Sequence, residues 1–176
     1  MSSNKIIKLV SAALMAAIVC VVTMTLAFPT PIGGYIHPGD GFVILSGVIL
    51  GPFYGGLAAG IGSMLADLLL GYSSYAGATL IIKGLAAIAA ALLFRALHRN
   101  NNHKIIPILL SGFVAGCIVS SGYFLYEGSL LGLGYGSALA NVPFNLLQNA
   151  FGIVISIVLF PLLYKVPQIR NIIQSK

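Results

Sequence analysis

Two stripes of polar side chains in the C-terminal half of the sequence have the composition of a binding site. In the first, Ser120 is followed by Tyr123 three residues later and by Glu127 seven residues later, so all three share one helix face. The second stripe consists of carboxamides, of which the first three share a face: Asn141, Asn145, Gln148 and Asn149. Such groups can hydrogen-bond a polar heterocycle, or they can join helices to one another.

A pair of opposite charges flanks a predicted turn at 71–75. Asp67 precedes the turn and Lys83 follows it, so the two could face each other in a helical hairpin. This arrangement indicates either a structural salt bridge or a cation that Lys83 offers to a ligand while Asp67 orients it. Thr79 lies one turn from Lys83 on the same face, and Tyr75 is expected at the mouth of the hairpin, where interfacial tyrosines are common.

The stretch 28–40, FPTPIGGYIHPGD, separates two long apolar runs and is rich in proline and glycine. Prolines fix φ and glycines permit tight turns, so this stretch cannot continue a helix. It carries three further candidates for ligand contact, Tyr35, His37 and Asp40. We expect either an ordered loop over a binding cavity or a rigid turn without ligand contact, with Asp40 as the N-cap of the next helix.

Several chemistries find no support in the sequence. It has neither G-x-x-x-x-G-K-[ST] nor a G-x-G-x-x-G set after a strand, so energy from ATP would have to come from another chain. The histidines His37, His98 and His103 are expected in loops or at a helix end, and none shares a face with a metal-ligating or nucleophilic partner. Cys20 and Cys117 lie in apolar runs and are interpreted as small hydrophobic residues. We therefore expect no metal, no cofactor and no enzymatic activity.

Composition places these residues in a membrane protein. The 176-residue chain is 59% hydrophobic and 7% charged, whereas a soluble domain carries about 25% charged residues. A spanning helix needs about 20 apolar residues. The sequence predicts an all-α integral membrane protein with one domain, 1–176, built as a bundle of six transmembrane helices at roughly 5–28, 40–51, 52–71, 76–98, 105–127 and 138–164.

The basic residues predict the orientation of this bundle. Eight of nine fall near the chain ends or the 98–104 connection: Lys5, Lys8, Arg95, Arg99, Lys104, Lys165, Arg170 and Lys176. By the positive-inside rule both termini are cytoplasmic, and the run 42–71 must cross twice with an inner turn at Gly51-Pro52. The polar residues Asp40, Asp67, Lys83 and Glu127 then fall in the outer half. At that depth the carboxamide stripe is level with Tyr123 and Glu127, which favours a heterocycle site over interhelical hydrogen bonding.

Small residues in the first helix form two pairs at four-residue spacing, Ala12 with Ala16 and Ala13 with Ala17. This spacing lets another helix approach closely in lipid. From the spacing alone, packing within the bundle is favoured over contact with a partner protein.

Four segments together resemble the substrate-binding (S) components of energy-coupling-factor (ECF) vitamin transporters. They are the alanine stripe of the first helix, GYIHPGDGFVILSGVILGPFYGGLAAGIGSMLADLLLGY at 34–72, IIKG at 81–84 and PFNLLQNAFG at 143–152. The resemblance implies six helices that bind one vitamin-like molecule near the outer surface. It also implies that the first external loop acts as a lid and that the last three helices supply most ligand contacts.

The resemblance also implies partners and a location. Ala12, Ala13, Ala16 and Ala17 would dock onto a transmembrane coupling subunit that two cytoplasmic ATPases drive, in a prokaryotic plasma membrane. The chain has no tryptophan, on which thiamine-binding members rely for stacking, so thiamine is disfavoured. Lys83 and the loop are similar to members that bind pyridoxine or hydroxymethylpyrimidine.

Two other classes of function compete with this prediction. A self-sufficient secondary carrier or channel for a small polar solute would be supported by inverted repeats and broken helices, and no convincing internal repeat is present. An intramembrane enzyme lacks a catalytic constellation. Nucleic-acid binding is not expected, because the net charge of +6 follows the topological pattern described above.

Overall fold

The computed structural model describes residues 3–30, 33–98 and 105–174. Within these ranges the chain forms seven α-helices, one turn of π-helix and a two-stranded antiparallel hairpin. In chain order they are α1 (Ser3–Thr25), β1 (Phe28–Pro29), β2 (Tyr35–Ile36), α2 (Asp40–Leu50), α3 (Pro52–Leu69), α4 (Ser73–His98), α5 (Ile105–Leu125), η1 (Tyr126–Leu130), α6 (Tyr135–Tyr164) and α7 (Pro167–Gln174). The first six helices match the predicted ranges to within three residues at each end.

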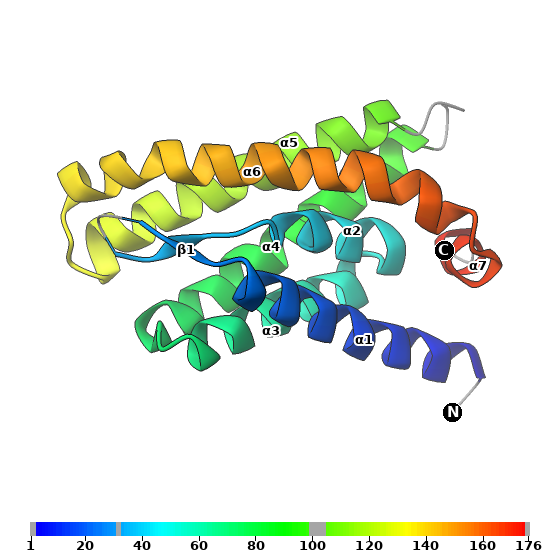
Figure 1. Cartoon of the computed structure of the whole chain (residues 1–176). Helices are drawn as coiled ribbons and strands as arrows, with labels where there is room; N and C mark the ends of the chain where they lie inside the picture. Colours follow the sequence, from blue (N-terminus) through cyan, green and yellow to red (C-terminus); the bar gives the residue numbers. More distant parts are fainter. Residues whose placement is uncertain (1–2, 31–32, 99–104, 175–176) are drawn as a thin grey trace.

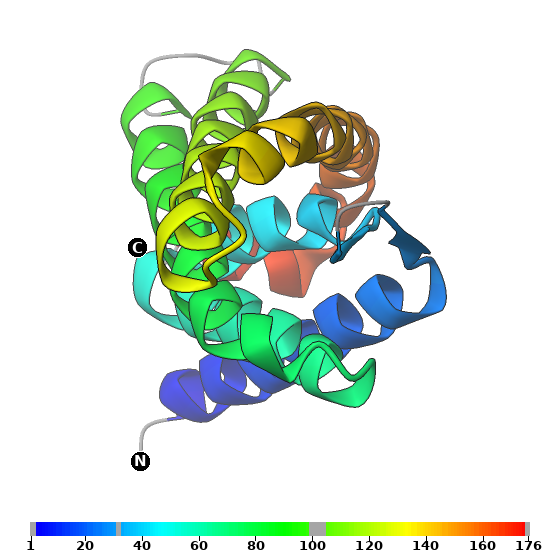
Figure 2. The same ribbon diagram turned by 90° about the vertical axis from the view of Figure 1, so that its left-hand side faces the viewer.

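The short helix α2 forms the centre of the bundle. Every residue of α2 except Phe42 is buried, as expected for a helix that is apolar on nearly all sides. It packs against α3, α4 and α6, while α1 packs on α3, α4 on α5, and α5 on α6. Figure 1 shows α2 between α1 and α3 on one side and α5 and α6 on the other, and Figure 2 shows the longer helices around it from the hairpin end.

Glycines at two points allow α2 to occupy this central position. Gly51 has φ 85° and forms the tight turn between α2 and α3, and Pro52 begins α3, where its missing N–H costs nothing. The predicted Gly51-Pro52 turn is thereby confirmed. Gly47 brings α2 against α4 so closely that a Cβ there would lie 2.0 Å from the carbonyl oxygen of Ala87. The core of the bundle therefore depends on backbone contact as well as on apolar side chains.

One local prediction needs correction, and one helix was not predicted. Gly39, not Asp40, is the N-cap of α2 and no side chain caps this helix, since Asp40 is the first helical residue and directs its carboxylate into the bundle. The helix α7 was not predicted at all. Its isoleucines recur at i, i+3 and i+4, with Ile172 buried and Ile169 and Ile173 packed against the core. This isoleucine spacing is the local signal that could have indicated the helix.

Four helical segments are long and apolar enough to cross a membrane, judged by length and composition: Lys5–Thr25, Ser73–His98, Ile105–Leu130 and Tyr135–Tyr164. The central helix α2 has 11 residues and α3 has 18. The six-crossing arrangement thus stays a prediction, whereas the helical class and the apolar spans are features of the structure.

Candidate ligand-binding site

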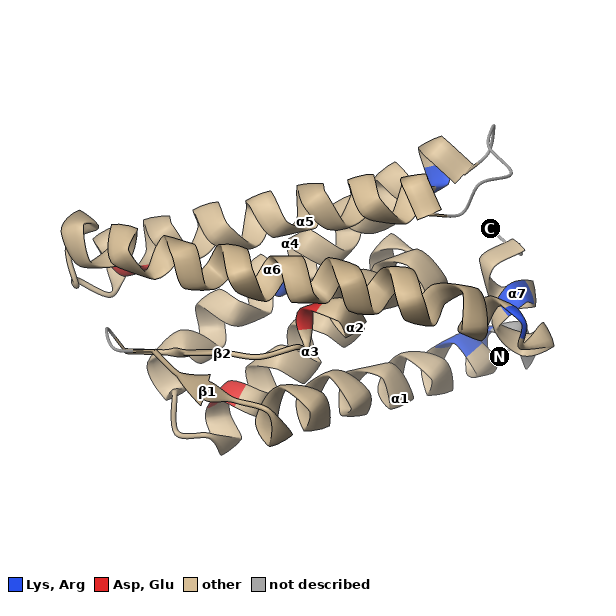
Figure 3. Ribbon diagram, turned by 45° about the horizontal axis from the view of Figure 1, so that its top comes forward, with Lys and Arg blue, Asp and Glu red and all other residues tan. Residues whose placement is uncertain are grey.

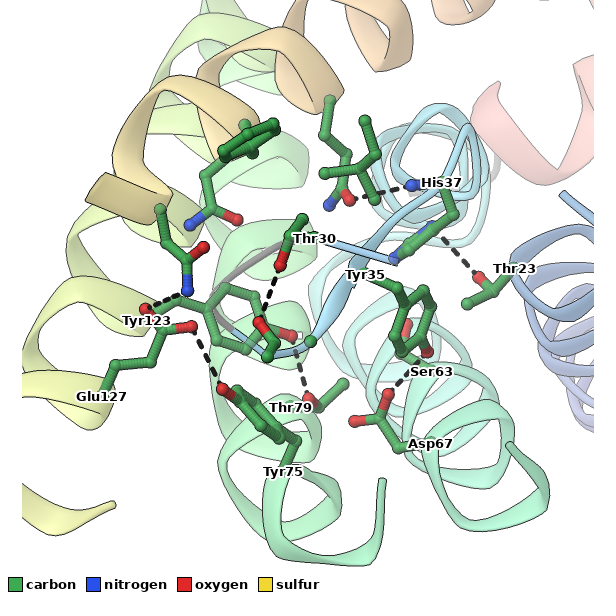
Figure 4. A pocket seen from close by; sticks show the side chains of 17 residues that line it. Thr23, Thr30, Tyr35, His37, Ser63, Asp67, Tyr75, Thr79, Tyr123 and Glu127 are labelled. Carbon is green, nitrogen blue, oxygen red and sulfur yellow. Dashed lines mark hydrogen bonds between the residues drawn. The ribbon is translucent and has the colours of Figure 1, made fainter. Parts of the chain in front are cut away.

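A cavity opens between the β1–β2 hairpin and the ends of α3, α4, α5 and α6 that lie beside it (Figure 4). Its empty volume is about 510 Å³, which includes the part open to solvent. The lining consists of Thr23, Thr30, Gly33, Gly34, Tyr35, Ile36, His37, Ser63, Asp67, Tyr75, Thr79, Tyr123, Glu127, Asn141, Phe144, Asn145 and Gln148.

Nine of the eleven residues expected from the sequence to contact ligand line this cavity: Tyr35, His37, Tyr75, Thr79, Tyr123, Glu127, Asn141, Asn145 and Gln148. They come from the hairpin segment, α4, α5, η1 and α6. The other two, Asp40 and Lys83, are buried behind the lining. The fold therefore brings together residues that are more than 100 positions apart, such as His37 and Gln148.

The hairpin is fastened to the bundle by hydrogen bonds from two of its residues. The phenol of Tyr35 donates to Asp67 Oδ1 of α3 over 2.6 Å, and burial together with this carboxylate raises the pKa of Tyr35, which keeps the phenol protonated. The backbone N–H of His37 donates to Gln148 Oε1 of α6 over 3.0 Å. The described part of the first loop thus lies against α3 and α6 and forms one wall of the cavity.

The ring of His37 is held as a neutral imidazole. Its Nδ1 accepts a hydrogen bond from the backbone N–H of Gly39 at 3.1 Å and lies 3.4 Å from the hydroxyl of Thr23. Burial lowers the pKa of His37 to about 3, with the positive charge of Lys83 acting in the same direction and the carboxylate of Asp40 opposing it. A neutral ring that accepts at Nδ1 carries its proton on Nε2.

The opposite wall is a set of tyrosines linked to polar groups (Figure 4). The phenol of Tyr75 donates to Glu127 Oε1 at 3.4 Å, and Asn141 Nδ2 donates to Glu127 Oε2 at 3.1 Å. The hydroxyls of Thr79 and Tyr123 are hydrogen-bonded at 2.8 Å. Because Tyr75 and Tyr123 also lie with ring centroids 6.4 Å apart, this wall offers aromatic surface beside hydrogen-bonding groups.

Below the cavity, Lys83 forms an ion pair with Asp40, with 2.5 Å between Nζ and Oδ1. The predicted pairing of Lys83 with Asp67 is therefore wrong. Gln148 Nε2 donates to the second oxygen of Asp40 at 2.8 Å, and the ammonium lies 5.4 Å from the ring centroid of Tyr123. Lys83 and Asp40 thus contact lining residues from behind, and the position of α2 between α4 and α6 explains the change of partner.

Sequence reasoning missed part of the lining, above all the wall that α3 supplies. Ser63 and Asp67 face the cavity from α3, and Thr23 and Phe144 contribute to it from α1 and α6. The remaining lining residues that were not predicted belong to the hairpin segment: Thr30, Gly33, Gly34 and Ile36. Among the described residues, Ser63 Oγ, Asp67 Oδ2 and Asn141 Oδ1 are buried cavity-lining atoms without a hydrogen-bond partner in the protein. The four-residue spacing of Ser63 and Asp67 could have indicated their shared face.

The remaining polar residues of the two stripes have structural roles. Asn149 Nδ2 donates to the carbonyl oxygen of Gly116 at 2.9 Å and to Ser120 Oγ at 2.8 Å, which joins α6 to α5. Neither Asn149 nor Ser120 lines the cavity. Within the described ranges, no three His, Cys, Asp or Glu side chains are grouped in a way that could hold a metal ion.

The four alanines of α1 divide into two pairs. Ala12 is buried, and Ala16 packs so close to α3 that a Cβ on Gly62 would lie 2.4 Å from its carbonyl oxygen. Ala13 and Ala17 are exposed on the outside of the bundle. Internal packing therefore uses the first pair, whereas the second pair is exposed on the surface of the bundle.

Charge is separated along the long axis of the molecule (Figure 3). Apart from Lys83 within α4, the described basic residues belong to the start of α1, the end of α4, and the α6–α7 connection with α7: Lys5, Lys8, Arg95, Lys165 and Arg170. Figure 3 shows these basic segments toward the end that holds both termini. The carboxylates of Asp67 and Glu127 lie toward the cavity end. The cavity is thus at the end remote from the basic residues.

An apolar helical bundle with a polar cavity at one end is the architecture of a membrane-embedded protein that binds a small molecule. A family model described as the S component of the ECF-type riboflavin transporter matches residues 3–165. The chain belongs to this family of transporter S components, which is not a family of enzymes. Its membrane location and its role as a substrate-binding subunit follow from that membership.

Two individual proteins and one solved structure are similar to the chain. A thiamine precursor transporter, HmpT of Lactococcus lactis subsp. cremoris (strain MG1363), is 30% identical over 165 residues, which cover 93% of this chain and 91% of that protein. A Pyrococcus woesei protein, described as "Uncharacterized protein in gap 3'region", is 35% identical over 139 residues. These residues cover 78% of this chain and 88% of that protein. A solved S component of a bacterial ECF transporter has a TM-score of 0.66 at 20% identity and covers 93% of this chain and 98% of its own.

Proposed function

We propose that this S component captures a small hydroxymethylated heterocycle, with hydroxymethylpyrimidine as the substrate that the cavity fits best. The observation that carries the proposal is the cavity wall in which tyrosine rings alternate with a carboxylate and carboxamides. Flat aromatic molecules stack on such rings, and the polar groups fix their orientation. The Lactococcus relative named as a thiamine precursor transporter supports this choice, because hydroxymethylpyrimidine supplies the pyrimidine half of thiamine.

The hydroxymethyl group finds its partner at Glu127. This carboxylate already accepts hydrogen bonds from Tyr75 and Asn141 and has lone pairs left for a ligand hydroxyl. Asn141 Oδ1 lies beside it as a buried cavity-lining acceptor. A hydroxyl donated to this cluster would fix one end of the ring, while Tyr75 and Tyr123 face the ring itself.

Pyridoxine is the closest competitor, because it carries hydroxymethyl groups on a similar aromatic ring. Riboflavin is the substrate in the family description, and its tricyclic ring and ribityl chain make it far larger than either heterocycle. We propose the order hydroxymethylpyrimidine, pyridoxine, riboflavin for affinity.

In this proposal the chain is one domain with six membrane crossings and cytoplasmic termini. The separation of basic and acidic side chains supports the orientation through the positive-inside rule. The cavity then opens outward. The chain delivers its substrate to a transmembrane coupling subunit driven by two ATPases, and the exposed pair Ala13 and Ala17 on α1 offers a surface for close helix contact.

Calorimetric titration of the detergent-purified chain tests the substrate. We expect hydroxymethylpyrimidine to bind at least tenfold more tightly than pyridoxine, and riboflavin and thiamine to give no measurable heat. Equal or tighter binding of pyridoxine or riboflavin would replace the proposed substrate. Reconstitution of the chain alone in liposomes separates capture from transport: binding without accumulation is expected, and accumulation without ATPases would indicate a self-sufficient carrier.

A further inference from the structure

On the α3 wall of the cavity, the carboxylate of Asp67 has a hydrogen bond at only one of its two oxygens. The side chain of Asp67 is almost fully enclosed, with a residue exposure of 4%, and its Oδ1 accepts a hydrogen bond from the phenol of Tyr35 at 2.6 Å. Its Oδ2 has no hydrogen-bond partner among the described residues. Ser63, one turn earlier on the same face and 1% exposed, likewise has a hydroxyl without a partner. Both residues line the cavity, and Figure 4 shows them together beneath Tyr35.

The neighbouring polar groups already have other partners. The ammonium of Lys83 is bonded to Asp40, and the hydroxyl of Thr79 is bonded to that of Tyr123. Thr79 also interacts with the carboxylate of Asp67, but it leaves Oδ2 without a hydrogen bond. A buried polar group without a hydrogen bond costs free energy, and a buried charge without a partner costs more. Such a cost is retained at functional sites, where a bound molecule supplies the missing partners.

We propose that Ser63 and Asp67 form a subsite that recognises an amino group and the adjacent ring nitrogen of the substrate. The proposal rests on the proposed function and specifies which edge of the heterocycle is recognised. The exocyclic amino group of an aminopyrimidine donates to Asp67 Oδ2, and the neighbouring ring nitrogen accepts from the hydroxyl of Ser63. Ser63 and Asp67 lie one turn apart on one helix face. The carboxylate oxygen of Asp67 matches the donor of this edge, and the hydroxyl of Ser63 matches its acceptor.

This subsite determines specificity between substrates of similar shape. Pyridoxine has a second hydroxymethyl group in place of the amino group and a hydroxyl-bearing carbon in place of the neighbouring ring nitrogen, so it does not offer Ser63 the same acceptor beside the donor for Asp67. The hydroxymethyl group of hydroxymethylpyrimidine meanwhile occupies the Glu127 side of the cavity. The two carboxylates therefore recognise two neighbouring substituents of one small molecule, the amino group and the hydroxymethyl group.

Substitution of Asp67 by Asn combined with removal of the ligand's amino group tests the contact. In the Asp67→Asn variant the amide oxygen keeps the bond from Tyr35 and the amide nitrogen, a donor, faces the cavity. We expect the variant to bind hydroxymethylpyrimidine roughly 10- to 100-fold more weakly than wild type, the range for hydrogen bonds to charged groups. Against 5-hydroxymethyl-2-methylpyrimidine, which lacks the amino group, both proteins should have equal affinity. An equal loss for both ligands, or no loss for either, overturns the subsite.

Ser63 has a matched control in Ser111. Both serines are buried and both hydroxyls lack a partner among the described residues, but only Ser63 lines the cavity. We expect Ser63→Ala to weaken hydroxymethylpyrimidine binding about three- to tenfold, as for a neutral hydrogen bond, and Ser111→Ala to leave it unchanged. Equal effects of the two substitutions would contradict the role of Ser63.

A measurement without ligand separates the subsite from the identity of the substrate. If Asp67 Oδ2 has no hydrogen-bond donor in the ligand-free protein, the carboxylate is a buried charge without a full set of partners. The Asp67→Asn variant without ligand should then have a higher melting temperature than wild type, because this buried charge is removed. An unchanged or lower melting temperature would show that the carboxylate is satisfied within the protein and would overturn the subsite. If wild type binds no aminopyrimidine, the proposed substrate is wrong. The melting temperatures without ligand still decide whether the carboxylate of Asp67 lacks a hydrogen-bond donor within the protein.

Discussion

Lys83 and Asp40 form a buried ion pair across the centre of the bundle, with 2.5 Å between Nζ and Oδ1 although 43 residues separate them in sequence. Side-chain exposure is 0% for Lys83 and 4% for Asp40. The pair connects α4 to the first turn of α2, and through Gln148 it also reaches α6. It supports the cavity from behind without lining it.

Removal of one partner of this pair should be far more harmful than removal of both. Lys83→Met leaves the carboxylate of Asp40 buried without its cation, which costs about 3–5 kcal/mol. The double variant Lys83→Met/Asp40→Asn is neutral and retains an oxygen for Gln148 Nε2, so it should fold with near-wild-type stability. Melting curves in detergent test this order, and titration of the double variant should give an affinity within a few fold of wild type. A folded double variant without binding would place Lys83 in the site, as the sequence first indicated.

The hydrogen bond between Tyr35 and Asp67 should control how long the ligand stays bound. Tyr35→Phe removes the fastening between the hairpin and α3 but keeps the ring contacts with His37 and Tyr72. We expect faster dissociation of hydroxymethylpyrimidine with little change in the association rate, measured by stopped-flow fluorescence or surface plasmon resonance. An unchanged dissociation rate would indicate that the hairpin is held mainly by the His37–Gln148 bond.

The exposed and packed alanines of α1 should respond differently to enlargement. Ala17→Leu should leave ligand affinity intact and reduce association with the coupling subunit, because a large side chain holds a partner helix away. Ala150→Leu places the same change on an exposed position of α6 and should leave assembly intact. Ala16→Leu should instead lower the stability of the isolated chain, since Ala16 packs on Gly62. Co-purification with the coupling subunit measures assembly, and melting temperatures measure stability, for all three variants. Equal assembly by the Ala17 and Ala150 variants would show that this face of α1 is not part of the interface.

Close contact of α2 with α4 predicts opposite outcomes for two glycines. A Cβ on Gly47 would lie 2.0 Å from the carbonyl oxygen of Ala87, so Gly47→Ala should prevent the folded protein from accumulating. Gly77 in α4 has no neighbouring atom within 4 Å of such a Cβ and no positive φ. Gly77→Ala should therefore be neutral or stabilise by up to about 1 kcal/mol through helix propensity. Size-exclusion profiles of the two variants provide the comparison, and normal folding of the Gly47 variant would contradict the close crossing.

Burial of neutral His37 predicts a loss of stability in acid. Its folded-state pKa of about 3 lies below the unfolded value, so the stability it contributes is fully present above about pH 6.5 and is lost as the pH falls toward 3. His37→Asn keeps an acceptor near the N–H of Gly39 but does not titrate. We expect the melting temperature of wild type to fall more steeply between pH 7 and pH 4 than that of the variant. Parallel pH profiles would show that His37 is not the group responsible.

The sequence by itself determined the helices, the lipid-compatible class and most of the cavity. Runs of about 20 apolar residues and turns such as Gly51-Pro52 are local signals, which operate before any tertiary contact forms. Helical periodicity likewise placed Tyr123 with Glu127 on one face and Asn141 with Gln148 on another. Because both faces belong to long helices that pack side by side, their meeting in one cavity could be anticipated.

Tertiary structure alone decided which charged groups meet. The pairing of Lys83 depends on the depth and rotation of α2, and α2 is apolar on nearly all sides, so its sequence pattern does not reveal how Asp40 is directed. Asp67 seemed the nearer partner along the chain, yet the packing turns it toward Tyr35 and the cavity. The ion pair and the hydrogen bond from Gln148 join three helices, and they depend on close crossings such as the contact of Gly47 with Ala87. No local sequence pattern encodes those distances.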